Sequence, residues 1–192
     1  MLRPPRRDNT PPGRPARRDR WHNPVMPNRG IELGLARTGE AAALAAMSRD
    51  LIEAGLGWTY RTPRMAALIG DAAVTVLVAR DDARPVGFAI MRFGDERARL
   101  ILLAVQPAWR RVGIARRMLH WLADSAAAAG TASIHVELRA GNTAAHDLYE
   151  AAGFSETFRV PGYYQGREAA VRMVRVLRAP GVVVPAWQPP AG

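Results

Sequence analysis

Apolar residues recur along the middle of the chain in short runs that polar turns separate. Five runs of alternating or continuous apolar residues are typical of β-strands: 31–36, 72–79, 85–93, 98–105 and 133–139. Two further strand-like runs lie near residues 154–160 and 168–177. The turns RDDAR and GDER join the second, third and fourth runs, so we expect these three strands to form an antiparallel meander.

Two helices are predicted in the first half of the chain. Thr38 is suited to cap a helix that ends at Gly55, and one face of that helix carries Leu44, Met47, Leu51 and Ala54. A loop with Trp58 and Tyr60 follows, and a short helix is expected near residues 63–70.

Two more helices are predicted in the second half. One runs from about residue 112 to 129 and ends at Gly130. The other opens at Asn142, ends at Gly153 and carries on one face Ala145, Leu148, Tyr149 and Ala152. The order of elements predicts an α/β fold with a mixed sheet, in which one parallel strand–helix–strand crossover follows the meander.

Prolines mark the boundaries of the folded unit. Eleven of the 15 prolines lie outside residues 30–178, so residues 1–29 and 179–192 are expected to be disordered tails around a single domain. Met26 stands just before the first strand-like run, which makes residues 1–25 a candidate upstream extension.

Composition and charge exclude several classes of protein. No apolar stretch is long enough for a membrane span or a secretory signal, and the absence of cysteine excludes disulfides and an acyl-cysteine intermediate. We therefore expect a cytoplasmic protein. The four histidines share no metal-ligand spacing, so no metal is expected. Most of the formal charge of +10 comes from the first tail, where eight arginines face only Asp8 and Asp19.

The segment RRVGIA, residues 110–115, lies where a strand gives way to a helix. The first N–H groups of a helix have no partner within it, and together with the helix dipole they favour an anion. Gly113 and Ala115 leave room for close approach, so the loop is a candidate phosphate cradle; otherwise it is a glycine turn before a solvated arginine face. Neither the Walker pattern nor the dinucleotide fingerprint is present.

Three segments together resemble the GNAT acetyltransferase superfamily, and in particular its ribosomal-protein-alanine N-acetyltransferase branch. They are LLAVQPAWRRVGIARRML, HVELRAGNTAAHDLYEAAGF and GYYQGREAAVRMVRVL, and the resemblance covers about residues 31–178. It implies a sheet whose fourth and fifth strands splay apart to hold acetyl-CoA. It further implies that the pantetheine arm binds the backbone of Leu103, Ala104 and Val105. The same resemblance assigns the pyrophosphate to Arg110, Arg111, Val112, Gly113, Ile114 and Ala115, and a further cofactor contact to Asn142.

Acetyl transfer to an amine needs a base, because only a neutral amine attacks a thioester. In SIHVELR the side chains of His135, Glu137 and Arg139 point to one face of the strand, which gives an inner strand a polar side. Together with the resemblance, this favours Glu137 as the base. Without the resemblance, the alternative interpretation is that Glu137 is a carboxylate paired in the neighbourhood of Arg139 or simply solvated.

The departing thiolate needs a proton, which a phenol can donate. Tyr149 is the candidate acid by its N-x(6)-Y spacing from Asn142, although its position also suits a core aromatic. With no cysteine and no serine in a nucleophile elbow, direct attack in a ternary complex is expected.

The acceptor is the least constrained part of the prediction. Trp58, Tyr60, Tyr163 and Tyr164 are candidate walls of a slot for a peptide N-terminus, or else packing residues. An N-terminal α-amino group is the expected acceptor, and the alternative is a small amine such as a polyamine, an amino acid or an antibiotic. A ribosome- or RNA-associated module that binds through its basic tail, and a GNAT-like domain without catalysis, remain open as other classes.

Overall fold

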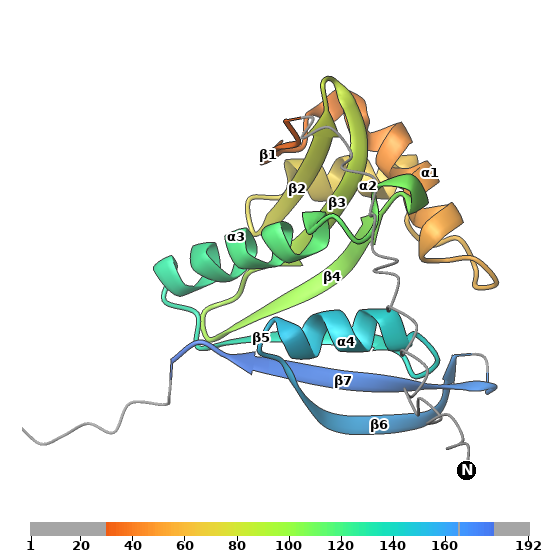
Figure 1. Ribbon diagram of the computed structural model, residues 1–192, viewed down its shortest axis with the longest axis vertical. Coiled ribbons are helices and arrows are strands. Elements are labelled where there is room, and N and C mark those ends of the chain that lie inside the picture. Colours follow the sequence, from red (N-terminus) through yellow and green to blue (C-terminus); the bar gives the residue numbers. More distant parts are fainter. Residues whose placement is uncertain (1–29, 165, 179–192) are drawn as a thin grey trace, which may run out of the picture.

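A seven-stranded mixed sheet with two helices on each face makes up the part of the chain that the computed structural model describes, residues 30–164 and 166–178 (Figure 1). The expected disordered tails and the candidate upstream extension lie outside these residues. The strands are β1 Glu32–Leu35, β2 Val74–Asp81, β3 Arg84–Arg92, β4 Arg97–Val105, β5 Ser133–Arg139, β6 Ser155–Tyr164 and β7 Glu168–Val176. The helices are α1 Ala41–Leu51, α2 Thr62–Gly70, α3 Ile114–Ala128 and α4 Thr143–Ala151.

The order of strands in the sheet is β1-β2-β3-β4-β5-β7-β6. The pairs β1–β2, β2–β3 and β3–β4 are antiparallel, whereas β4 and β5 are parallel and are connected through α3. The last two strands pair antiparallel to each other, and β7 lies beside β5. The predicted α/β class, with a meander followed by one parallel crossover, is therefore confirmed. In the described part of the chain, no helix is both long and apolar enough to cross a membrane.

Strands β4 and β5 begin side by side and then diverge, as Figure 1 shows. Their pairing extends only from Arg97 opposite Ser133 to Leu100 opposite Val136, although β4 continues to Val105. The register with β3 shifts at this point, which leaves Ile101 as a bulge residue. Because a bulge bends its strand and increases the local twist, β4 turns away from β5 after the bulge, and the two strands no longer pair.

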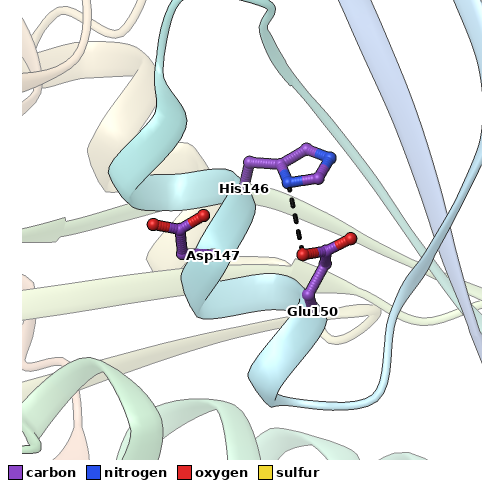
Figure 2. A group of neighbouring side chains, drawn as sticks. All are labelled: His146, Asp147 and Glu150. Atoms are coloured by element: carbon purple, nitrogen blue, oxygen red, sulfur yellow. Dashed lines mark ion pairs between the residues drawn. The ribbon is translucent and has the colours of Figure 1, made fainter.

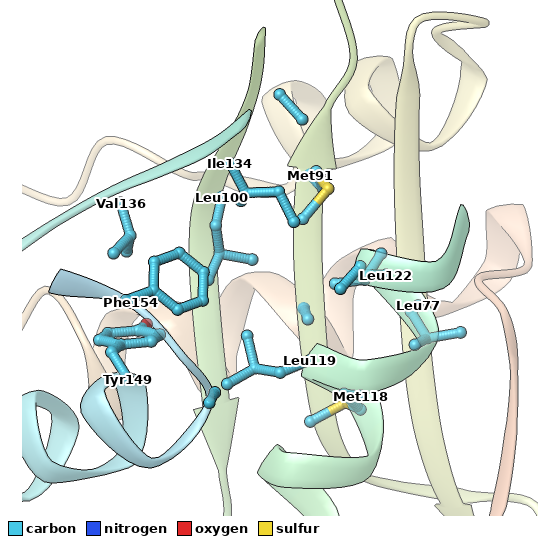
Figure 3. Packing of buried hydrophobic residues seen from close by; sticks show 14 of the residues in the cluster. Leu77, Met91, Leu100, Met118, Leu119, Leu122, Ile134, Val136, Tyr149 and Phe154 are labelled. Atoms are coloured by element: carbon cyan, nitrogen blue, oxygen red, sulfur yellow. The ribbon is translucent and has the colours of Figure 1, made fainter. Parts of the chain in front are cut away.

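Two apolar cores hold the helices against the sheet. One core packs α3 and α4 on one face, where α3 contributes Met118, Leu119 and Leu122 (Figure 3). The other core packs α1 and α2 against β2, β3 and the second half of β4. The bulge exchanges the faces of β4, since Leu100 belongs to the first core and Leu102 to the second. Both sides of the opening are thus anchored in well-packed cores.

The first helix differs from its prediction at both ends. Thr38 is not its cap but lies in a short 3₁₀ turn, η1 Thr38–Glu40, that precedes α1. The helix ends at Leu51, before Gly55, and Ala54 is exposed. The early end has a local cause, because the buried Glu53 carboxylate turns to accept hydrogen bonds from the backbone N–H groups of the following loop.

A half-buried ion pair fastens η1 to the sheet. Arg80 of β2 donates from Nε and Nη2 to the two carboxylate oxygens of Glu40, at 2.7 and 2.6 Å, and also to the carbonyl of Leu35 at 2.9 Å. Glu40 additionally accepts from the backbone N–H of Arg37. The hydrogen bond from Arg80 lowers the pKa of the Glu40 carboxyl below its usual range.

We expect Glu40→Gln to destabilise the fold by about 3 kcal/mol at pH 7, because it leaves Arg80 buried without its counter-charge. The folded pKa of Glu40 is the lower one, so its contribution is complete above the unfolded pKa and is lost as the pH falls through the folded value. Urea unfolding of wild type and variant at pH 7 and pH 3 measures this. Asp50→Asn is the control, because it breaks the exposed ion pair with Arg49 and should leave the free energy of unfolding unchanged. An equal gap at both pH values would contradict the assignment.

Candidate active site

A cleft of about 830 Å³ occupies the opening between β4 and β5. The segment after α1 forms one wall, β4 and β5 form the floor, and α4 with the β6–β7 hairpin forms the other wall. All four tyrosines of the chain line it: Tyr60, Tyr149, Tyr163 and Tyr164. Four aromatic hydroxyl-bearing side chains in one hollow indicate a site that binds an organic ligand.

The loop that joins β4 to α3 turns its backbone outward. Arg111 and Gly113 both have left-handed backbone conformations, with φ of 66° and 86°. The N–H of Arg117 donates to the carbonyl of Gly113, so the N–H groups before it lie ahead of the first intrahelical bond. A side chain built at Gly113 would meet nothing within 4 Å. The turn therefore offers open amides at a positive helix end, an arrangement suited to a phosphate.

The predicted cradle residues differ in how they face this turn. Arg111, Val112 and Gly113 are exposed, and Arg110 is exposed but donates from Nε to the carbonyl of Val105 at 3.0 Å. The side chain of Ile114 is buried in the core, so only its backbone is available to a ligand. The half-buried Ala115 packs against the same core.

The second half of β4 has one edge without a strand. Leu103, Ala104 and Val105 pair with β3, and β5 has already diverged on the other side. Leu103 lines the cleft, whereas the side chains of Ala104 and Val105 are buried. This edge of β4 leads from the candidate phosphate-binding turn at residues 110–115 to the floor of the cleft.

Glu137 lies on β5 with its side chain 14% exposed and lines the cleft. The predicted alternation of β5 is confirmed, since Ile134, Val136 and Leu138 are buried. The partner of the carboxylate is Arg172 of β7, whose Nε lies 3.0 Å from Oε2, and not the neighbourhood of Arg139. A hydrogen bond between Tyr163 and Glu137 raises the pKa of the Tyr163 phenol.

Tyr149 of α4 is both a packing residue and a cleft residue. Its ring lies 5.5 Å from that of Phe154, and Figure 3 shows the pair beside Leu100 and Val136. The side chain also lines the cleft. Burial raises the pKa of its phenol well above the usual value of 10, so the hydroxyl keeps its proton at neutral pH.

Asn142 caps α4 as predicted, because its Oδ1 accepts from the backbone N–H of Ala145 at 3.1 Å. It also lines the cleft, near the end of β5. One residue therefore fixes the start of α4 and the edge of the site.

Trp58 does not line the cleft, in contrast to Tyr60, Tyr163 and Tyr164. It is partly buried and packs against the core of α1 and α2, with the guanidinium groups of Arg49 and Arg61 at 5.4 and 5.6 Å from its ring.

No pattern in the sequence singles out Glu53, although this residue lines the cleft and is 6% exposed. Its carboxylate accepts from Ser48 Oγ at 2.9 Å and from the backbone N–H of Thr59 at 2.6 Å. It thereby fixes the loop that carries Tyr60. Three arginines of the cleft were also missed, since single charged residues in turns and strands carry no pattern: Arg64, Arg92 and Arg99.

One group of side chains among the described residues is close enough to share a metal ion: His146, Asp147 and Glu150 on α4 (Figure 2). His146 Nδ1 lies 3.7 Å from Glu150 Oε2, and its Nε2 lies 3.4 Å from Glu156 of β6. None of these residues lines the cleft.

The fold defines the class of protein, since a mixed sheet that parts between two parallel strands with a helix between them is the fold of an N-acetyltransferase. The chain belongs to the GNAT family of N-acetyltransferases, since the model of the Acetyltransferase (GNAT) family matches residues 44–154.

Known relatives lie in the branch that the sequence resembles. The [ribosomal protein bS18]-alanine N-acetyltransferase of Salmonella typhimurium is 36% identical over 107 residues, which cover 54% of this chain and 72% of that protein. The match to the Escherichia coli enzyme of the same name, at 37% identity, covers 48% of this chain and 64% of that protein.

Solved structures agree with this family. The crystal structure of the ribosomal-protein-S18-alanine N-acetyltransferase from Escherichia coli superposes with a TM-score of 0.70 at 25% identity, over 80% of this chain and 98% of that one. Arabidopsis thaliana NAA60, solved in complex with acetyl-CoA, shares the fold with a TM-score of 0.68 at 15% identity, over 76% of this chain and 98% of that one.

Proposed function

We propose that this N-acetyltransferase transfers the acetyl group of acetyl-CoA directly to the α-amino group of a protein or peptide N-terminus. The observation that carries the proposal is the cleft between β4 and β5, which runs beside Glu137 and Tyr149. The relatives whose names specify a ribosomal-protein alanine support this class of acceptor.

The residues around the cleft fit acetyl-CoA, which when bound supplies an acetyl thioester. The outward turn of residues 110–115 has the open backbone and the positive helix end that a pyrophosphate needs. The unpaired edge of β4 at Leu103, Ala104 and Val105 offers backbone groups to an extended amide-bearing arm. Asn142, at the edge of the cleft, would also meet this arm.

Glu137 would accept the proton of the incoming amine, directly or through water. Its carboxylate faces the cleft, and Arg172 and Tyr163 hold its orientation. Tyr149 would protonate the departing thiolate, because its burial keeps the phenol in the acid form that can donate. No covalent acyl-enzyme is proposed, because the chain has no cysteine and no serine in a nucleophile elbow.

Thiol release from acetyl-CoA, followed with a panel of N-terminal peptides and small amines, tests the acceptor. Turnover of peptides above all small amines is the expected result. A preference for polyamines, amino acids or amine antibiotics would replace the N-terminal acceptor by the small-amine alternative.

We expect Glu137→Gln to lower kcat about a hundredfold and to leave the Kd of acetyl-CoA unchanged, because it removes a base but not a binding group. Stopped-assay kinetics and calorimetric titration measure the two effects. Glu168→Gln is the control: it also replaces a carboxylate that is paired with an arginine, Arg139, but Glu168 itself does not line the cleft, so kcat should stay near that of wild type. Unchanged turnover in Glu137→Gln would favour the non-catalytic binding domain.

A further inference from the structure

Arginines dominate the charged groups of the cleft. Four of them line it among the described residues: Arg64, Arg92, Arg99 and Arg139. The two carboxylates that line it are already engaged, Glu53 with Ser48 and the backbone of Thr59, and Glu137 with Arg172. Apart from the reacting amine, which Glu137 would receive, a positively charged acceptor would therefore find no free counter-charge among these lining groups.

A second, smaller hollow of about 370 Å³ adjoins the cleft. The two hollows share Arg99, Val136 and Glu137, so a chain that enters the cleft can continue into the second hollow. The second hollow adds Arg97 and His135. Burial and the nearby guanidinium groups lower the pKa of the His135 imidazole, so this ring is neutral at pH 7 and adds no charge.

Three of the six arginines that line the two hollows are paired. Arg92 lies 3.0 Å from Asp71, Arg139 lies 3.6 Å from Glu168, and Arg172 binds Glu137. Arg64, whose guanidinium carbon lies 4.7 Å from the centroid of the Tyr60 ring, forms no ion pair with any described residue. Neither do Arg97 and Arg99. They lie two positions apart on β4 before the bulge, so their side chains leave the same face of the strand.

We propose that the acceptor is an acidic peptide, in which Asp or Glu residues directly after the amino terminus bind Arg99 and Arg97. This inference rests on the proposed function and specifies its substrate. Guanidinium and carboxylate groups form charge-assisted, bidentate hydrogen bonds, and a basic peptide is repelled from the same surface. Arg99, at the border of the two hollows, would thus bind the residue that follows the reacting amine.

Three peptides that differ only at positions 2 to 4 test this: Ala followed by Asp and Glu, by Asn and Gln, or by Arg and Lys. With wild type we expect kcat/KM to be about tenfold higher for the acidic peptide than for the neutral one, and lowest for the basic one. Arg99→Gln should remove the preference by lowering kcat/KM for the acidic peptide to that of the neutral one, mainly through a higher KM for the acidic peptide. Arg99→Glu should favour the basic peptide.

Arg84→Gln, at an exposed arginine outside both hollows, is the matched control that keeps the wild-type preference. Equal kcat/KM for the acidic and neutral peptides would overturn the acidic acceptor and leave the N-acetyltransferase proposal intact. Turnover of small amines with no peptide acetylated would overturn both. A third outcome is that the three peptides have equal kcat/KM while single-stranded RNA inhibits wild type but not Arg99→Gln. This outcome would assign the surface to nucleic acid and would also overturn the proposal.

Discussion

Gly113→Glu is expected to abolish acetyl-CoA binding while the chain remains folded. A side chain at this position enters open space in front of the cradle, where the proposal places the pyrophosphate. The carboxylate brings both bulk and like charge to that place, so we expect the Kd of acetyl-CoA to rise about a hundredfold or more. Calorimetric titration with acetyl-CoA and with CoA measures the loss.

Backbone strain needs a separate control, because Gly113 has a φ of 86° and any L-residue there costs about 1–2 kcal/mol. Gly130, just after α3, has a φ of 81° and is equally free of neighbours within 4 Å. Gly130→Glu therefore carries a similar strain far from the cradle and should keep its affinity. Equal affinity in Gly113→Glu and wild type would rule out the cradle as the pyrophosphate site.

Tyr149→Phe is expected to lower kcat by about two orders of magnitude with little change in acetyl-CoA affinity. The ring stays in place against Phe154, so packing and melting temperature should be nearly those of wild type. Only the proton donor is lost. Pre-steady-state kinetics of thiol release separate this chemical step from product release.

Two comparisons identify the hydroxyl as the acid. Tyr164→Phe removes the same group from another wall of the cleft and should change KM for the acceptor more than kcat. Because burial raises the pKa of Tyr149, its ionisation should cause no fall in kcat on the alkaline side up to pH 10. A turnover number of Tyr149→Phe equal to that of wild type would refute the role.

Local features of the site could be predicted because their causes lie within a few residues. Asn142 caps α4 through the N–H three positions later, and Gly113 adopts the left-handed conformation at the start of α3. The polar face of β5 with Glu137 also follows from the alternation of a single strand. Each of these depends on backbone geometry that short segments impose by themselves.

Long-range features could not be predicted in this way. Glu137 meets Arg172 across 35 residues, and the Glu53 carboxylate turns inward at a position that continues the helical pattern. From the sequence, Trp58 was as good a candidate for the wall of the cleft as Tyr60, yet it does not line the cleft and packs against the core of α1 and α2. Nothing in the apolar run of β4 marks Ile101 as a bulge residue.

The sequence by itself determined the order of strands and helices, the mixed sheet, the cap at Asn142 and, by resemblance, the family. Hydrophobic periodicity and helix caps are local, so one segment at a time suffices to predict them. Only the tertiary structure decided where the cleft lies, which carboxylate pairs with which arginine, and that Arg97 and Arg99 are without counter-charges among the described residues. These properties depend on which distant segments meet: β4 diverges from β5 at the cleft, and β7 pairs with β5 so that Arg172 lies opposite Glu137.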